Sequence, residues 1–279
     1  MITAVINMKG GVGKTTLCAN LAIGLAKYHD KRVLLIDLDP QSNLTQSLLK
    51  PDKYRKYLET ETNCTIKDIF IDRPTESVGL AQKSKQTTSE IIPTVKNSTV
   101  RIYGKEDSAS FCDLIPSRLE LMEAETLERG VENRLGIFLD KIKDAYDLIF
   151  LDCPPTMGLF TLSAFIASNS YLVPLKPDYL SSVGLPLINK AITIFQKNFK
   201  ISLKYLGLIF TMVQSTNLMR DTMIEIKQDP NNKCFDQILS HSTSIAETVR
   251  DNQNIFDISA RYSEEMVTIV DEFVTRMDD

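Results

Sequence analysis

The chain has 279 residues, of which 43% are hydrophobic and 24% charged, and its formal net charge is −4. This is the composition of an ordinary globular protein, and the length suits a single α/β domain over residues 1–279 without requiring a second domain. No apolar run is long enough to cross a bilayer, and the acidic balance argues against a protein that coats DNA through its overall charge, although it leaves room for a local basic patch.

The N-terminal segment predicts a strand, a glycine-rich loop and a helix in immediate succession. Between an apolar run at residues 2–6 and a helix-like stretch at residues 17–26, the loop reads Lys9, Gly10, Gly11, Val12, Gly13, Lys14, Thr15 and Thr16. The three glycines lack side chains that would block close approach, so consecutive backbone N–H groups can point at an anion at the positive end of the helix. This pattern predicts the phosphate site of a nucleoside triphosphate, with Lys14 at the β and γ phosphates and the Thr15 hydroxyl on Mg²⁺.

The loop departs from the strict phosphate-loop pattern at two positions. Met8 stands where that pattern has its first glycine, and Lys9 adds a second lysine five residues before Lys14. In these respects the segment from Met8 to Thr16 resembles the deviant Walker A loop of the ParA/MinD family. In that family the additional lysine reaches the phosphates of the partner subunit in an ATP-sandwiched dimer, so the resemblance assigns Lys9 this role. The alternative, a glycine-rich turn without a ligand, is disfavoured by the strand before the loop and the helix after it.

Two further apolar runs end in carboxylates. Residues 33–36 lead into Asp37 and Asp39, and residues 148–151 lead into Asp152. Buried parallel strands deliver such acids at their C-terminal ends, beside the glycine loop. A lone acid after a strand is commonly only a helix cap or a turn former. The order of the three motifs, however, matches the family, and the resemblance assigns Asp39 to orienting the attacking water and both Asp39 and Asp152 to the magnesium shell.

Apolar runs and helical periods alternate along the chain. Strands are predicted near residues 2–7, 33–37, 112–115, 147–152, 171–175 and 205–210. Helices are predicted near residues 15–28 and 41–49, within 118–144, and near 157–168, 184–197, 215–228 and 263–277. The alternation predicts an α/β fold with a doubly wound, mostly parallel sheet covered by helices on both faces, whose ligand lies at the C-terminal strand ends.

Residues 50–110 are interpreted as an insertion into this domain. The segment is rich in Lys, Thr, Ser and Glu, and it is longer than the resemblance leads us to expect. Within it, residues 83–89 are predicted to be a loop and residues 100–103 an added strand. Two interpretations stay open, a partner-binding or regulatory insertion and a tolerated surface excursion with a small hairpin, and the second is favoured.

Residues 234–250 lie where the family carries a loop near the adenine base. Here the chain reads Leu239-Ser240-His241-Ser242-Thr243-Ser244, which departs from the family pattern, so the base-contacting residues are left open. His241 is interpreted as a loop histidine without a catalytic role, because no nucleophile accompanies it.

The residues and the resemblance together predict ATP hydrolysis without a covalent intermediate, with Lys9, Lys14 and Asp39 as the catalytic residues and ATP and Mg²⁺ as the ligands. The resemblance implies a short ParA-type partition ATPase, acting in plasmid or chromosome segregation. Its ATP-bound homodimer would bind DNA nonspecifically, and a ParB-like centromere-binding partner would stimulate turnover. The candidate phosphate contacts to DNA, each of which is otherwise an ordinary solvated charge, are Lys190, Lys197, Lys200, Lys204, Arg220 and Arg250.

Three other functions were weighed. A MinD-like membrane-positioning ATPase needs a basic amphipathic C-terminal helix, whereas residues 263–279 are acidic, so we expect no membrane partner. An iron–sulfur reductase needs paired cluster cysteines, whereas the five cysteines here are dispersed. Dispersed, odd-numbered cysteines and the lack of a visible signal peptide favour a cytoplasmic location, and the resemblance implies nucleoid association in the ATP-bound state. A ParA-like positioner of a non-DNA cargo stays open.

Overall fold

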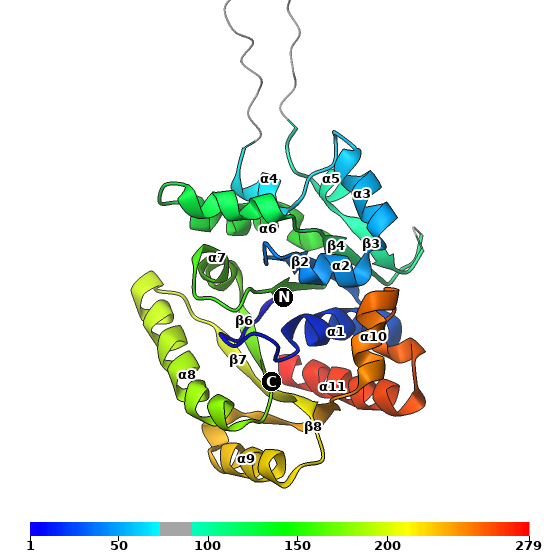
Figure 1. Cartoon of the computed structure of the whole chain (residues 1–279). Helices are drawn as coiled ribbons and strands as arrows, with labels where there is room; N and C mark the ends of the chain where they lie inside the picture. Colours follow the sequence, from blue (N-terminus) through cyan, green and yellow to red (C-terminus); the bar gives the residue numbers. More distant parts are fainter. Residues whose placement is uncertain (73–90, 106, 279) are drawn as a thin grey trace, which may run out of the picture.

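The computed structural model describes residues 1–72, 91–105 and 107–278, and within them eight strands form one sheet (Figure 1). The order across the sheet is β3-β4-β2-β5-β1-β6-β7-β8. The strands are β1 Ile2–Val5, β2 Arg32–Asp37, β3 Val100–Tyr103, β4 Phe111–Ile115, β5 Leu148–Asp152, β6 Ser170–Leu175, β7 Lys204–Val213 and β8 Cys234–Ser240. Neighbouring strands pair in parallel except β3 and β4, which are antiparallel. The expected mostly parallel sheet is confirmed.

Helices cover both faces of the sheet, as expected for a doubly wound fold. They are α1 Lys14–Tyr28, α2 Asn43–Leu48, α3 Pro51–Glu59, α4 Ile66–Phe70, α5 Val95–Ser98, α6 Arg134–Ile142, α7 Leu159–Ala167, α8 Tyr179–Phe199, α9 Asn217–Gln228, α10 Thr243–Asp251 and α11 Ala260–Asp278. Helices α1, α10 and α11 bury side chains in one apolar cluster, and α6, α7 and α8 bury theirs in another. Among the described residues, no helix combines the length and the apolar composition needed to span a bilayer.

Strand β2 shows how one run of residues serves both clusters. Val33 and Leu35 belong to the cluster under α1, whereas Leu34 and Ile36 belong to the cluster under α6. Successive side chains of a strand point to opposite faces, and all four side chains are fully buried. A strand that is covered on both faces must therefore be apolar throughout, which is why the sequence signals this strand so clearly.

The structure corrects the sequence prediction for residues 234–250, which form regular elements rather than a loop. Strand β8 lies at the sheet edge and buries only Phe235 and Leu239, so its apolar pattern is weak. Helix α10 is short, and its N-cap Ser242 accepts a hydrogen bond from the Ser244 N–H at 3.1 Å. Residue His241 lies between the two elements, in a connection as predicted.

The described parts of residues 50–110 contribute to both the core and the sheet. In α4, Ile66 and Phe70 are fully buried in the cluster that α6 also joins. The added strand predicted at residues 100–103 is confirmed as β3, which extends the sheet beyond β4. Residues 83–89, predicted as a loop, lie outside the described residues. Whether the segment is an insertion stays a prediction.

Candidate nucleotide site

The glycine loop connects the end of β1 to the start of α1 at Lys14. Gly11 and Gly13 have φ values of +70° and +81°, in the left-handed region that glycine adopts without strain. A side-chain carbon placed on Gly10 or Gly11 would meet nothing within 4 Å, because the loop faces open space. The loop therefore forms an uncovered cradle at the N-terminus of α1, which is the geometry that suits an anion.

Two side chains from the neighbouring strands hold the loop in place. Asn7 accepts a hydrogen bond from the Lys9 N–H at 2.9 Å and donates from its amide to the Pro174 carbonyl of β6 at 2.8 Å. Thr211 of β7 donates to the Val12 carbonyl at 2.5 Å. The loop is thus preorganised before a ligand binds. Sequence reasoning missed both residues; a polar residue directly after the apolar run of β1 was the available signal for Asn7.

Lys14 is the buried cation of the site, with 7% of the residue exposed. Its ammonium donates to the Lys9 carbonyl at 3.2 Å. Burial lowers the pKa of Lys14, and the nearby Asp152 carboxylate partly opposes that shift. A desolvated ammonium at the mouth of an anion cradle can neutralise phosphate charge more strongly than an exposed one.

Asp152 lies beneath the loop next to Asp37, because the two residues are paired across β2 and β5. Asp152 Oδ2 accepts a hydrogen bond from the Thr15 hydroxyl at 2.8 Å, whereas its Oδ1 is buried and has no hydrogen-bond partner among the described residues. Burial, reinforced by the charge of Asp37, raises the pKa of Asp152 to about 8. An unpartnered carboxylate oxygen beside a hydroxyl is a hard donor set that fits Mg²⁺.

The other two acids of the site differ from each other. Asp37 is fully buried, and it accepts hydrogen bonds from the backbone and hydroxyl of Thr45 at 2.8 and 2.7 Å. Burial raises its pKa to about 7. Asp39 instead lies at the cavity wall, where it accepts a hydrogen bond from the Gln41 N–H at 2.9 Å. Asp37 thus fixes the start of α2, and Asp39 is the acid that faces the cavity.

A cavity of about 540 Å³ extends from the loop across the strand ends. Its phosphate end is lined by the glycines of the loop and by Lys14, Thr15, Thr16 and Asp39. Its other end is lined by residues of β8, α10 and the connection between them: Leu239, Ser240, His241, Ser242, Ile245, Ala246 and Val249. The volume is that of a small-molecule site, and the far end, largely apolar with a few hydroxyls, suits a flat aromatic base. The segment that departs from the family pattern, residues 239–244, therefore lies at the base end.

Lys9 does not line this cavity. Its ammonium lies 2.6–2.7 Å from both carboxylate oxygens of Asp178. Asp178 caps α8 by accepting a hydrogen bond from the Ser181 N–H at 3.0 Å. Burial alone would raise the pKa of Asp178, but its hydrogen bonds with Lys9 and Ser181 lower it below the usual value. The structure thus brings Lys14, Thr15, Asp39 and Asp152 together and leaves Lys9 outside this group.

The six basic residues weighed as DNA contacts are all exposed but do not form one patch on a single chain. Lys190 and Lys197 lie on α8, and Arg250 lies on α10, on the opposite side of the molecule in Figure 1. The Arg250 guanidinium pairs with Asp251 at 2.8 Å. Lys200 directly follows α8, Lys204 is the first residue of β7, and Arg220 lies on α9.

A parallel sheet whose first strand leads through a glycine loop into a helix, with acids at the ends of two adjacent strands, defines a P-loop nucleotide-binding protein. Residues 1–205 match the model of a family described as "AAA domain", and the chain belongs to that family. Within it, the chain is of the ParA/Soj type, as the deviant loop indicates and as its relatives confirm.

Two relatives and one solved structure illustrate this membership. The chain is 31% identical to the sporulation initiation inhibitor protein Soj of Bacillus subtilis (strain 168) over 252 residues, covering 88% of this chain and 86% of Soj. It is 28% identical to the chromosome partitioning protein ParA of Myxococcus xanthus, covering 99% of this chain and 88% of that protein. The fold matches cobyrinic acid a,c-diamide synthase from Mycobacterium smegmatis, solved with a bound ATP analogue and magnesium, with a TM-score of 0.75, 23% identity and coverage of 100% and 95%.

Proposed function

We propose that this protein is a ParA-type ATPase of plasmid or chromosome partition, which binds ATP with Mg²⁺ and hydrolyses it. The observation that carries the proposal is the group of Lys14, Thr15 and Asp152 beneath an open glycine cradle. Among the described residues the buried Oδ1 of Asp152 has no hydrogen-bond partner, and a divalent cation beside the Thr15 hydroxyl would satisfy it.

Hydrolysis would proceed without a covalent intermediate. The loop N–H groups and Lys14 would hold the phosphates and stabilise the charge that develops on them. Thr15 and Asp152 would hold Mg²⁺, which when bound supplies further neutralisation of the phosphate oxygens. Asp39, on the cavity wall, would orient the attacking water, and it would also reach the magnesium shell.

ATP would also join two copies of the chain. Lys9 lies outside its own cavity, and the residues near it expose apolar surface: Met8 is 43%, Tyr179 69% and Leu180 68% exposed. Met8 precedes Lys9, and Tyr179 and Leu180 follow its partner Asp178. This edge is the face on which a second copy would dock, with Lys9 released from Asp178 and turned to the partner's phosphates.

The ATP-bound dimer would bind DNA nonspecifically, and a ParB-like centromere-binding protein would stimulate its turnover. The names of the relatives support a role in partition. Because the candidate cations are spread over one chain, dimerisation would have to align those of α8 and α9 on one face. The protein would then be cytoplasmic and associated with the nucleoid while ATP is bound.

The competing functions differ in how the structure bears on them. A MinD-like role would need a lipid-facing apolar side on the C-terminal helix, but Met266, Ile269, Val270 and Phe273 of α11 are fully buried against the sheet. A ParA-like positioner of a non-DNA cargo would use the same nucleotide cycle and stays the second candidate.

The proposal is tested by measuring binding to a nonspecific DNA duplex at two salt concentrations, with and without ATP, for the wild type and Lys14→Ala. We expect binding that requires ATP, weakens steeply with salt and is lost in Lys14→Ala. Absence of DNA binding, with ATP-dependent dimerisation intact, would contradict the DNA assignment and favour the non-DNA cargo.

A further inference from the structure

The segment between β4 and α6 contains a 3₁₀ helix, η1 Leu119–Thr126, that exposes apolar side chains. A 3₁₀ helix has about three residues per turn, so residues three apart lie in one row along it. The row of Leu121 and Ala124 is fully buried in the apolar cluster under α6. The row of Leu119 and Met122, in contrast, is 63% and 53% exposed at these two residues. The proposed ATPase mechanism uses neither of the two exposed side chains.

Acidic side chains accompany this apolar row. Glu125 continues the row by the same step of three residues, and Leu127 and Glu128 follow directly after the helix; all three residues are exposed. Among the described residues, Glu125 and Glu128 have no ion-pair partner, whereas Glu123, on the neighbouring row, pairs with Lys67 at 2.9 Å. We call the following exposed residues the η1 surface: Leu119, Met122, Glu125, Leu127 and Glu128.

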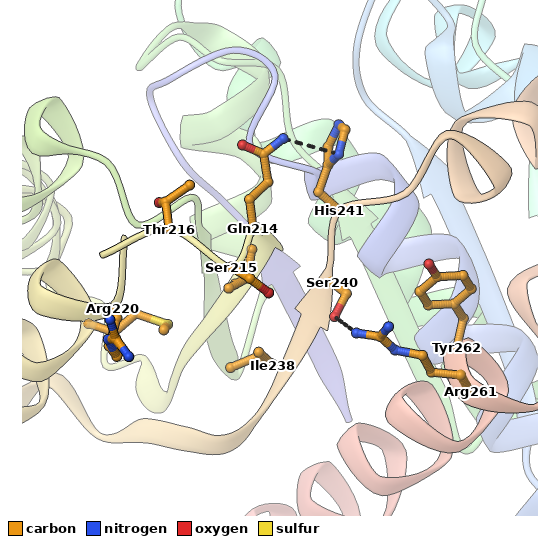
Figure 2. A pocket seen from close by; sticks show the side chains of 11 residues that line it. Gln214, Ser215, Thr216, Arg220, Ile238, Ser240, His241, Arg261 and Tyr262 are labelled. Atoms are coloured by element: carbon orange, nitrogen blue, oxygen red, sulfur yellow. Dashed lines mark hydrogen bonds between the residues drawn. The ribbon is translucent and has the colours of Figure 1, made fainter. Parts of the chain in front are cut away.

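The η1 surface combines apolar side chains with negative charge, and in this it differs from two other exposed regions. Residues 119–129 hold four glutamates and one arginine. Helix α8 exposes Leu187 and Ile194, yet its 21 residues include lysines and no acid. Beyond the ends of β7 and β8, Figure 2 shows a cavity of about 650 Å³ with Arg220 and Arg261 on its two sides, and none of the described residues that line it is acidic. A basic segment is therefore attracted to η1 and repelled from these two regions.

Ser117 connects the start of η1 to Asp39. Ser117 is fully buried, two residues before the helix begins. Its hydroxyl donates to the Asp39 carbonyl at 2.9 Å, and its N–H donates to the Thr45 hydroxyl at 2.9 Å. Its carbonyl accepts a hydrogen bond from the Tyr54 hydroxyl at 2.6 Å. The polar groups of Ser117 thus all engage residues that follow β2, so a shift of η1 is transmitted to Asp39.

The other end of η1 lies against the connection that follows β5. A side-chain carbon placed on Gly158 would lie 3.6 Å from the Glu125 carboxylate. Gly158 lies in the chain between Asp152 and the first residue of α7. Each of the two strands that lead to the acids of the candidate site therefore continues into a segment that η1 contacts. A ligand on the η1 surface is placed to act on the site without entering the nucleotide cavity.

We propose that the η1 surface binds a basic, amphipathic helical segment of another protein, and that this docking repositions Asp39 through Ser117. Lysine or arginine side chains of the segment pair with Glu125 and Glu128, and its apolar side chains cover the three apolar residues of the surface. Nucleic acid does not fit here, because the glutamates repel its phosphates. The docking surface stands on contacts and charges alone, whereas its effect on the water that Asp39 would orient rests on the proposed function.

The probe for docking is a synthetic peptide of about 16 residues, made of Lys, Leu and Ala with leucines at helical spacing, so that one face is apolar and the other basic. Fluorescence anisotropy would measure its binding to the nucleotide-free, full-length protein. We expect saturable binding that weakens as salt screens the charges. A peptide of the same composition in shuffled order, which keeps the charge but has no apolar face, should bind about tenfold more weakly.

Variants locate the binding. Met122→Ser should raise the Kd of the peptide about fivefold, because it removes apolar contact area, and Glu125→Gln about threefold, because it removes one charge. The matched controls are Leu187→Ser, an equally exposed apolar residue on α8, and Glu59→Gln, an exposed glutamate on α3. Both controls should leave the Kd unchanged.

Amide hydrogen exchange, followed by mass spectrometry, measures the coupling to Asp39. We expect the peptide to slow exchange in residues 119–128 and to change exchange in residues 39–48. Ser117→Ala removes the hydrogen bond to the Asp39 carbonyl. This variant should bind the peptide with unchanged Kd, but the change in residues 39–48 should become smaller. Neither anisotropy nor exchange requires ATP turnover or DNA binding, so a failure of the proposed function would not alter these results.

Each outcome decides one part of the proposal. Binding that Met122→Ser weakens and Leu187→Ser does not supports the docking surface, and an exchange change in residues 39–48 that depends on Ser117 supports the coupling. No binding, or equal weakening in Met122→Ser and its control, overturns the docking surface. Binding at η1 with unchanged exchange in residues 39–48 overturns the coupling. Self-association of the protein alone that Met122→Ser abolishes identifies a second copy as the occupant and overturns the assignment of a basic partner.

Discussion

The two ends of the nucleotide cavity are built in different ways. The phosphate end consists of polar groups of one short loop, tied by hydrogen bonds to distant strands such as those of Asn7, Thr15 and Thr211. The base end is apolar and is assembled from β8 and α10, far along the chain. Chemistry that depends on charge needs fixed donors, whereas a flat base needs mainly a slot of the right shape. The comparison predicts large effects at the first end and modest ones at the second.

The largest effect is expected from Lys14→Ala. Removing the buried ammonium leaves the phosphate charge without its main side-chain partner, so ATP turnover should fall by about 10³-fold. Steady-state phosphate release measures this. Lys56→Ala, an exposed lysine on α3, is the matched control and should retain full turnover.

Asp152→Asn should have the next largest effect. The amide removes the negative charge next to Thr15, so Mg²⁺ should bind about 100-fold more weakly and the magnesium concentration needed for half-maximal turnover should rise accordingly. A magnesium titration of ATP turnover measures the change. An unaltered magnesium requirement would show that Asp152 does not hold the metal.

At the base end, Val249→Ala should weaken ATP binding only about fivefold and leave turnover at saturating ATP unchanged, because it removes uniform binding. Val249 lies on α10 with 42% of the residue exposed, so the smaller alanine should leave the core intact. KM and kcat for ATP distinguish the two ends directly. A loss of kcat as large as that of Lys14→Ala would show that the base end and the phosphate end do not differ in this way.

A further effect, which does not depend on ATP, is expected on the stability of the nucleotide-free protein. Burial raises the pKa of Asp37 to about 7 and of Asp152 to about 8. In the unfolded chain the pKa values of both carboxyl groups are near 3.8. At a pH between these values and the folded-state values, the two carboxyl groups keep their protons in the folded chain but have lost them in the unfolded chain. The free energy of unfolding should therefore decrease as the pH rises from 4 to 8. Urea unfolding at several pH values measures the slope, and Asp152→Asn should flatten it.

The difference between the two ends of the nucleotide cavity also explains how much of the site could be predicted from the sequence. The loop from Lys9 to Thr16 and the strand ends at Asp39 and Asp152 are contiguous signals, and the sheet that carries them follows from continuous apolar runs. The base end could not be predicted, because β8 is an edge strand with only Phe235 and Leu239 buried. The Lys9–Asp178 ion pair joins residues 169 positions apart, and no local pattern indicates such a contact.

The proposed joining of two chains by ATP through Lys9 is tested by the mass of the wild type and of Lys9→Ala in ATP and in ADP, measured by light scattering alongside turnover. We expect the wild type to be a dimer in ATP and a monomer in ADP. Lys9→Ala should still bind ATP but stay monomeric and lose most of its turnover. A monomeric Lys9→Ala protein with full ATP turnover would contradict the account.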